Sequence, residues 1–341
     1  MLKQLALRDE EFFLNSLNTS IIDRTKLNGN VVIKSFKEIF KPLLFKNKES
    51  VSFKINNHHF SNLCLLSKDF KRTLSKVGRL SWFALLEGQP VKIYECHNES
   101  HAMFIEEVSK HFELHFFFPR CLIRDGSYLV VQWIEGEQVT WRQIYRDDNL
   151  FDQVAKIQTL LHEHKIEFQK DHNGFSYIDY LKNRLNKFKG ILPLNEDIRM
   201  IFENIDEDLP HERECISHPD LTANNMIIES DTGQLKIIDN ELLTQNSYFL
   251  IDLYNTYLSF GSKFENVILE PYLKRYTDNG GDLSKLIRHQ EFYSALWSVR
   301  LIGSFLQAGK IKQAIHLSKR YLDGSGESHP IIRLAKQKFV Q

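Results

Sequence analysis

The segment "ISHPDLTANNMIIESDTGQLKIIDNELL", residues 216–243, decides the fold class, because it contains two short apolar strands joined by a turn. The strands are "NMIIE" and "LKIID", and the turn "SDTG" between them predicts an antiparallel β-hairpin. Polar residues gather at the mouth of this hairpin. His218, Asp220 and Asn225 precede the first strand, and Asp239 and Glu241 follow the second.

The predicted hairpin geometry brings these polar residues close to one another. Antiparallel strands joined by a tight turn return to the same end, so we expect Asn225 and Asp239 to lie together, with Asp220 on the loop beside them. An Asp and an Asn that share a divalent cation, next to a further carboxylate, suit phosphoryl transfer. The alternative is that Asp220 is a turn or cap residue in a polar hairpin mouth.

The wider pattern favours the chemical interpretation. "HPDLTANN" matches the catalytic-loop pattern H-x-D-L-x-x-x-N, and Asp239 ends a strand 14 residues after Asn225, as a metal-binding aspartate of this chemistry does.

Composition indicates an ordinary globular protein. The 341 residues include 44 basic and 44 acidic side chains, so no global field attracts nucleic acid or an anionic membrane. The four cysteines lie far apart, which favours reduced thiols in a cytoplasmic protein over a disulfide framework or a zinc site. We expect neither a signal peptide nor a membrane-spanning run of about 18 apolar residues.

The remaining sequence predicts a sheet-rich part followed by a helical part. From Leu74, "LSKVGRLSWFALLEGQPVKIYE" predicts strands with turns between them, and "FPRCLIRDGSYLVVQWIEGE" predicts two more. Between them, "NESHAMFIEEVSKHF" predicts a helix capped by Asn98 or Ser100, with Phe104, Val108 and Phe112 on one face. Helical patterns follow in "LFDQVAKIQTLLHEHKI", "YIDYLKNRLNKF", "EFYSALWSVRLIGSFLQ" and "IKQAIHLSKRYL".

With "HPDLTANN…IIDNE" in place, the sequence resembles the protein-kinase-like superfamily, in its aminoglycoside phosphotransferase and choline kinase branch. The resemblance covers about residues 70 to 265, with the helical tail matching more loosely. It implies an α+β, bilobal fold with a small antiparallel-sheet N-lobe containing one helix and a larger, mainly helical C-lobe. The implied lobes are 1–134 and 135–341, with 1–66 an extension of uncertain role and 67–134 the nucleotide-binding sheet.

The resemblance also implies roles for the hairpin residues. Asp220 would position the acceptor hydroxyl and take its proton, with His218 and Asn225 as further candidate catalytic residues. His218 more readily supports the loop backbone than it shuttles protons. Asn225 and Asp239 would hold Mg²⁺ on the phosphates of ATP, and Glu241 either stays near the metal or is exposed. A further aspartate, Asp252 in "YFLIDLYNTYLSF", would steady the active-site segment.

For nucleotide binding, "SYLVVQWIEGE" resembles the strand and linker that join the lobes. Backbone groups of Gln132, Trp133 and Ile134 would therefore face an adenine. Lys34, Lys54 and Lys92 each stand in an apolar strand, and Lys92 is our candidate for the ATP-anchoring lysine. It lies 40 residues before Gln132, which leaves room for one helix and two strands.

Other nucleotide-site assignments rest on weaker patterns. Glu107 is the candidate helical partner of Lys92, with Glu106 as the alternative. The "SKVGRLS" turn is a candidate phosphate cover. Pro219 replaces the usual glycine of the catalytic loop, which fixes φ and removes an N–H without removing a reactive group.

The predicted activity is an ATP- and Mg²⁺-dependent phosphotransferase acting on a hydroxyl of a small molecule or sugar. Acceptor recognition would fall to the helical lobe, where "EFYSALWSVRLIGSF" supplies aromatic residues and Arg300. One alternative is a catalytically weak pseudokinase that acts as a nucleotide-binding scaffold. A protein kinase is disfavoured, because no A-P-E segment or activation loop follows Asp239.

Overall fold

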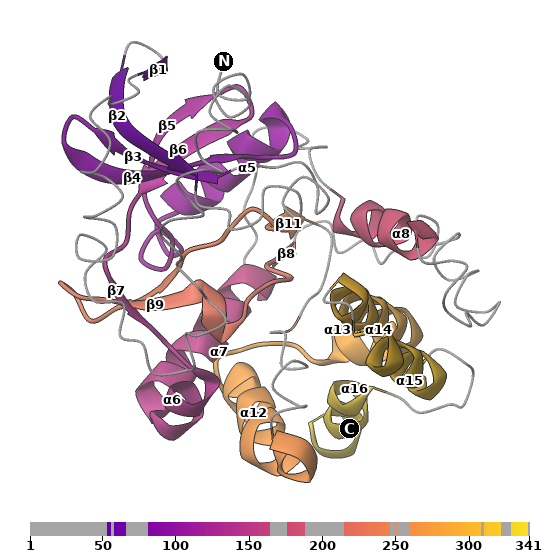
Figure 1. Cartoon of the computed structure of the whole chain (residues 1–341). Coiled ribbons are helices and arrows are strands. Elements are labelled where there is room, and N and C mark those ends of the chain that lie inside the picture. The colour runs from indigo at the N-terminus through magenta and orange to yellow at the C-terminus, as the bar shows by residue number, and fades with distance from the viewer. Residues whose placement is uncertain are drawn as a thin grey trace. The chain divides into compact units, whose positions relative to one another are not determined.

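The structure is a computed structural model that describes residues 53–55, 58–65, 81–163, 176–187, 215–245, 250, 260–307, 310–321 and 329–339. The chain divides into two compact units (Figure 1). We call Met1–Thr140 with Met226–Glu241 the sheet unit, and Trp141–Asn225 with Leu242–Gln341 the helical unit.

The sheet unit contains a six-stranded antiparallel sheet in the order β1-β2-β3-β4-β6-β5. Its strands are β1 (Phe53–Ile55), β2 (His58–Leu65), β3 (Ser81–Leu86), β4 (Gln89–Glu95), β5 (Cys121–Asp125) and β6 (Tyr128–Gln132). The predicted strand pairs β3–β4 and β5–β6 are confirmed. Strand β2 was not predicted, and it carries the sheet into the segment that was interpreted as an extension.

Local turn chemistry explains how β3 and β4 pair. The two residues between them, Glu87 and Gly88, both have positive φ, 51° and 84°. A two-residue hairpin loop of this kind matches the right-handed twist of the strands, and glycine adopts it without steric cost.

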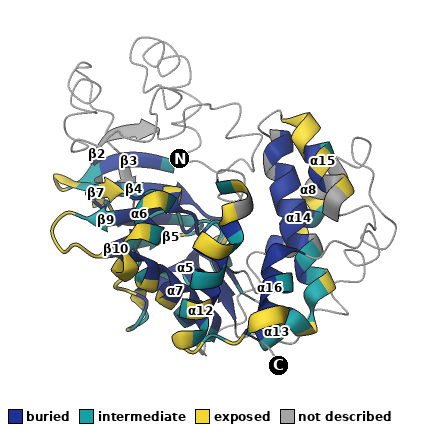
Figure 2. Ribbon diagram, turned by 90° about the horizontal axis from the view of Figure 1, so that it is seen from below, coloured by how far each residue is buried: buried dark blue, intermediate teal, exposed yellow. Residues whose placement is uncertain are grey.

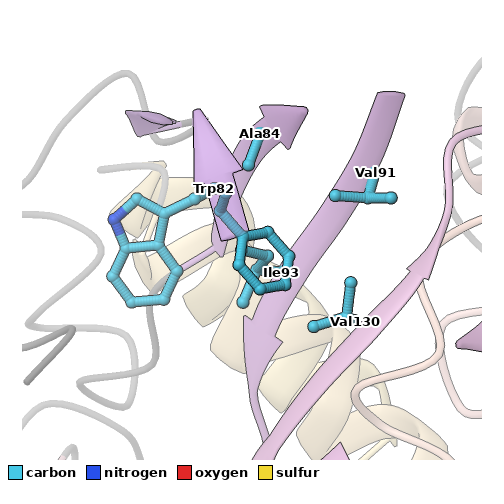
Figure 3. Close-up of a cluster of buried hydrophobic side chains, with 6 residues drawn as sticks. Trp82, Ala84, Val91, Ile93 and Val130 are labelled. Atoms are coloured by element: carbon cyan, nitrogen blue, oxygen red, sulfur yellow. The ribbon is translucent and has the colours of Figure 1, made fainter. Parts of the chain in front are cut away.

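One face of this sheet buries a cluster of apolar side chains (Figure 3). Alternate residues of neighbouring strands build it, because side chains on a strand point to opposite faces in turn. Its buried members are Phe60, Trp82, Ala84, Val91, Ile93 and Val130.

The helix of the sheet unit is α5 (Glu99–Lys110). Its N-cap is Asn98, whose side chain accepts a hydrogen bond from the backbone N–H of His101 at 2.9 Å, as one of the two predicted caps. Phe104 and Val108 are buried as predicted. The prediction was wrong for Phe112, which is 69% exposed because the helix ends at Lys110 before it.

The predicted hairpin consists of β9 (Met226–Glu229) and β10 (Leu235–Ile237). Met226 pairs with Ile237, so the strand ends meet as expected. The sequence did not reveal β7 (Gly136–Gln138), which pairs with β9 and makes the hairpin part of a three-stranded sheet in the order β10-β9-β7. The hairpin therefore groups with the sheet unit, whereas the division at residue 134 had assigned it to the second lobe; that lobe boundary stays a prediction.

Within the described residues, the helical unit contains eight α-helices, and four of them match the predicted helical segments: Asp148–Glu163, Tyr177–Lys187, Gln290–Gln307 and Ile311–Tyr321. The eight helices are α6 (Trp141–Arg146), α7 (Asp148–Glu163), α8 (Tyr177–Lys187), α12 (Glu270–Asp278), α13 (Ser284–Arg288), α14 (Gln290–Gln307), α15 (Ile311–Tyr321) and α16 (Pro330–Lys338). Short 3₁₀ turns lie at Ala223–Asn225 and Gly261–Lys263, and a π-helical turn at Glu265–Leu269. Strand β8 (Ile216–Ser217) pairs with β11 (Thr244–Gln245).

The packing of the helical unit follows its apolar faces. Val154, Ile157 and Leu161 form the predicted buried face of α7. Helix α14 packs against both α8 and α15, and it is buried along most of its length (Figure 2). These observations confirm the predicted α+β fold class, with an antiparallel sheet and one helix in one unit and a mainly helical second unit.

Among the described residues, no helix combines the length and apolar character needed to cross a membrane. The apolar strand predicted around Lys34 lies within residues 1–52, which are outside the described residues. The predicted "SKVGRLS" turn lies outside them too, except for its last residue, Ser81.

Gly136 is required by close strand packing. A Cβ built at this position would lie 2.0 Å from the carbonyl oxygen of Ile228 on β9. We predict that Gly136→Ala pushes β7 away from β9 and lowers the free energy of unfolding by about 1–3 kcal/mol, as overpacked sites do. Urea unfolding followed by circular dichroism measures this change.

The control for Gly136→Ala is Glu135→Ala. Glu135 is exposed, and its backbone oxygen accepts a hydrogen bond from the N–H of Ser230 in either variant. Equal stability losses for the two variants would contradict the packing explanation.

His329 begins α16 from a buried position. Its Nδ1 accepts a hydrogen bond from the backbone N–H of Ile331 at 3.4 Å. Burial lowers the pKa of His329 from 6.5 to about 3, with Arg333 acting in the same direction. The imidazole therefore caps the helix in its neutral form.

This low pKa predicts acid destabilisation. Between about pH 3 and pH 6.5 the unfolded chain binds a proton that folded His329 does not, so the free energy of unfolding falls as pH falls, by up to about 1.4 kcal/mol per pH unit. His329→Asn keeps a capping acceptor but does not titrate, and it should flatten this slope. Urea unfolding at several pH values measures it. The exposed His316→Asn should retain the wild-type slope, and an unchanged slope in His329→Asn would refute the assignment.

Candidate active site

The predicted catalytic loop connects β8 to the 3₁₀ turn Ala223–Asn225 in the helical unit. Short-range backbone hydrogen bonds shape it: the N–H of Leu221 donates to the oxygen of His218 at 3.1 Å, and the N–H of Thr222 to that of Asp220 at 2.8 Å. The N–H of Asn225 then donates to the oxygen of Thr222 at 2.9 Å. The loop is thus defined by its own backbone.

The carboxylate of Asp220 is held at both oxygens. Asn225 Nδ2 donates to Asp220 Oδ2 at 3.0 Å and to its backbone oxygen at 2.9 Å. Arg300 Nη2 donates to Asp220 Oδ1 at 2.6 Å. The Asp220 side chain is nevertheless 38% exposed. Because a carboxylate has about four lone-pair sites, each oxygen keeps room for a further hydrogen bond.

Arg300 lies in α14 with its side chain 9% exposed. Burial disfavours its charge, but neighbouring Tyr177 and Asp220 outweigh that cost and raise the pKa of Arg300. The sequence predicts a role for Arg300 in acceptor recognition and does not reveal its contact with Asp220. The available signal was a charged residue within an otherwise apolar run of α14.

Asn225 presents a free oxygen, within the part of the chain that the structure describes. Its Nδ2 is engaged by Asp220, and its Oδ1 has no hydrogen-bond partner among the described residues. An amide oxygen is a ligand that Mg²⁺ accepts, whereas an amide nitrogen is not. The orientation of Asn225 therefore suits the predicted metal role.

His218 is completely buried, and the neighbouring Pro219 is buried as well. The backbone oxygen of His218 supports the loop through Leu221, as given above. A supporting role for the His218 side chain fits this burial and stays a prediction.

In the sheet unit, Lys92 on β4 contacts Asp239 just after β10. Lys92 Nζ lies 3.3 Å from Asp239 Oδ1 and 3.4 Å from the backbone oxygen of Ile238. The two side chains are 17% and 36% exposed. The hairpin reaches this position because the N–H of Ile237 donates to the oxygen of Phe117 at 2.7 Å.

Tyr94 flanks this ion pair, with Lys92 Nζ 5.4 Å from the centre of its ring. Burial raises the pKa of Tyr94 well above its usual value, and the neighbouring thiols and the carboxylates of Glu241 and Asp239 add to the effect. Tyr94 therefore stays a neutral phenol beside the charged pair.

The glutamates of α5 differ in their partners. Glu106 contacts Arg124 Nε at 2.7 Å and Lys110 Nζ at 2.6 Å. Burial alone would raise the pKa of Glu106, but the hydrogen bonds from Lys110 and Arg124 lower it overall. Glu106 is thus engaged elsewhere, and the pairing of Glu107 with Lys92 stays a prediction.

The linker residues offer backbone groups. The N–H of Gln132 donates to the oxygen of Arg120 at 2.9 Å, and that of Trp133 donates to Pro90 at 3.3 Å. Among the described residues, neither backbone group of the buried Ile134 has a hydrogen-bond partner. Of the three predicted adenine-facing residues, Ile134 therefore has backbone groups available for a ligand.

The side chains available for a cation carry oxygen donors. Asp239 Oδ2 and Asn225 Oδ1 have no partner in the described ranges. No group of three or more His, Cys, Asp and Glu side chains suited to a metal ion occurs in those ranges. Each of these oxygens, taken by itself, is a donor of the kind that Mg²⁺ accepts.

Some of the residues that the sequence suggests as candidates are not described by the structure. Asp252 and Lys34 lie outside the described residues, and the placement of the Lys54 side chain is likewise not described. Lys92 is the candidate lysine for which the structure gives a contact with the hairpin.

A known protein family matches the segment that contains Lys92, Asp220, Asn225 and Asp239. The sequence model of the "Phosphotransferase enzyme family" matches residues 91–286, which is more than half of the 341 residues. The chain belongs to this family, which confirms the predicted resemblance to aminoglycoside phosphotransferase-like kinases. No curated protein sequence matches the chain.

Solved structures similar to the chain include a choline kinase, LicA, from Streptococcus pneumoniae, at 18% identity, a TM-score of 0.49, and coverage of 84% of this chain and 98% of that chain. An ethanolamine kinase from Plasmodium vivax has 15% identity, a TM-score of 0.48, and coverage of 80% and 83%. A thermostable mutant of aminoglycoside phosphotransferase APH(4)-Ia has 11% identity, a TM-score of 0.46, and coverage of 86% and 99%.

We predict that the Lys92–Asp239 pair contributes little to stability. An ion pair at 3.3 Å between partly exposed groups couples by at most about 1 kcal/mol. A double-mutant cycle with Lys92→Met and Asp239→Asn, followed by urea unfolding, measures this coupling. The exposed pair Lys274–Asp278 provides a control cycle. A coupling above about 3 kcal/mol would instead mark the Lys92 pair as structural.

Proposed function

We propose that the chain is an ATP- and Mg²⁺-dependent phosphotransferase that transfers the γ-phosphate to a hydroxyl of a small molecule or sugar. The observation that carries this proposal is the carboxylate of Asp220. Each of its oxygens accepts a hydrogen bond, and its side chain remains 38% exposed. It lies in the predicted catalytic loop of a chain that belongs to a phosphotransferase family.

Asp220 would act on the acceptor. A hydroxyl that donates a hydrogen bond to its carboxylate is oriented for attack on the γ-phosphorus. A bond forms between the acceptor oxygen and the γ-phosphorus, and the bond from that phosphorus to the β–γ bridging oxygen breaks. The hydroxyl proton passes to Asp220, and ADP leaves with the bridging oxygen. Asp220 needs a fixed orientation for this step, because positioning supplies most of the catalysis in phosphoryl transfer.

Lys92 and Asp239 would act on the nucleotide. Their mutual contact is long and partly exposed, so a phosphate oxygen would readily replace the carboxylate at Lys92. Asp239 and Asn225 would hold Mg²⁺, which, when bound, supplies neutralisation of the phosphate charge. Gln132, Trp133 and Ile134 would face the adenine, where the backbone groups of Ile134 have no partner among the described residues.

The acceptor is the less defined half of the proposal. Tyr293 and Trp297 of α14 are buried, with their ring centres 5.9 Å apart, so we assign them to the core of the helical unit and not to an acceptor cage. The proposed acceptor class therefore rests on the ability of the Asp220 carboxylate to orient a hydroxyl and accept its proton.

We predict that Asp220→Asn lowers phosphate transfer by at least about 100-fold while ATP binding persists, because the change removes a proton acceptor and keeps its shape. Labelled ATP with a panel of small hydroxyl acceptors measures transfer. A thermal-shift titration with MgATP measures binding, and Asp239→Asn should reduce the shift.

The matched control is Asp231→Asn, the same chemical change in the exposed turn of the hairpin. It should leave both transfer and binding at the wild-type level. Binding of MgATP by the wild type with no transfer to any acceptor would favour a nucleotide-binding scaffold. An absence of both binding and transfer would reject the phosphotransferase proposal.

A further inference from the structure

We propose that Arg300 is a positioning residue for the transfer step, and that it orients the Asp220 carboxylate from α14 with support from Tyr177 of α8. This inference rests on the proposed function of Asp220. It assigns a role in phosphate transfer to two residues that lie 80 and 43 positions from Asp220 in the sequence.

The contacts of Arg300 join three elements of the helical unit. Its Nη2 donates to Asp220 Oδ1 at 2.6 Å, and its guanidinium also donates a hydrogen bond to the Tyr177 hydroxyl. Tyr177 is 2% exposed at the start of α8, a helix that packs against α14. The guanidinium of α14 therefore contacts both α8, through Tyr177, and the loop after β8, through Asp220.

Arg300 is a charged residue among buried apolar residues of α14. Its neighbours on α14, Val299, Leu301 and Ile302, are all buried. A buried cation among apolar side chains is costly unless it is paired and hydrogen-bonded. Hydrophobic residues of similar volume often serve stability as well as a buried ion pair does, so a stability role gives a weak reason for an arginine here.

The geometry at Asp220 gives a stronger reason. Arg300 occupies Oδ1 and Asn225 occupies Oδ2, so the plane of the carboxylate is set by donors on both sides. Without Arg300 the carboxylate would retain one donor and could rotate about it. A misplacement of about 1 Å at a reacting group costs about 100-fold in rate.

The test compares full-length wild type with Arg300→Ala, Arg300→Lys and Tyr177→Phe. Turnover of MgATP is measured by phosphate release with water as the acceptor, and kcat and KM are determined separately. Arg300→Ala is also assayed with added guanidinium chloride. Controls contain sodium chloride at the same concentration, or urea, which has the shape of guanidinium without its charge. Crystal structures of wild type and Arg300→Ala report the orientation of the Asp220 carboxylate.

We expect Arg300→Ala to lower kcat by about 100-fold with the KM for MgATP changed by less than about 3-fold. Added guanidinium should restore part of kcat, and neither urea nor sodium chloride should. Arg300→Lys should be intermediate, since lysine keeps the charge but lacks the planar fork. Tyr177→Phe should show a smaller loss of kcat, because the guanidinium keeps its contact with Asp220.

The proposal is overturned if Arg300→Ala keeps wild-type kcat, or if its loss of turnover resists guanidinium while Asp220 retains its orientation in the crystal. If the wild type neither binds nor turns over MgATP, the proposed function fails separately. The crystal structures then decide the positioning role alone: a reoriented carboxylate in Arg300→Ala supports it, and an unchanged one rejects it.

Discussion

The ion pair between Arg300 and Asp220 is the constraint that ties α14 to the loop after β8. A guanidinium that is 9% exposed must be paired, and its partners come from α8 and from the loop after β8. The same contact leaves Asp220 38% exposed. One interaction therefore satisfies a buried charge and presents a carboxylate in a defined orientation, which links the packing of the helices to the chemistry proposed for the loop.

A second constraint governs the sheet unit, where the hairpin depends on close backbone contact. Strand β9 pairs with β10 on one side and with β7 on the other, and Gly136 permits the approach of β7. These pairings hold the end of β10 so that Asp239 contacts Lys92. The chain passes between the two units at Asn225 and Met226, so the two proposed metal-binding residues belong to different units.

Local patterns predicted those parts of the fold that short-range physics controls. The strand pairs β3–β4, β5–β6 and β9–β10 follow from alternating apolar residues and turn residues, and the Asn98 cap follows from side-chain chemistry at a helix start. The buried position predicted for Phe112 failed because apolar spacing continues past the point where α5 ends. Strand β7 was missed because it is defined by a partner that lies elsewhere in the sequence, whereas β2 was missed although it pairs with β1 directly before it.

The sequence by itself determined the fold class and the hairpin, and it led to the proposal of Asp220, Asn225 and Asp239 as site residues, because a motif of fixed spacing specifies residue types and their order. Only the tertiary structure decided that Glu106 pairs with Arg124, that Asp239 contacts Lys92 and that Arg300 reaches Asp220. These contacts join residues 18, 147 and 80 positions apart. Separations of this kind are set by how helices and strands pack, and a pattern of neighbouring residues contains no record of them.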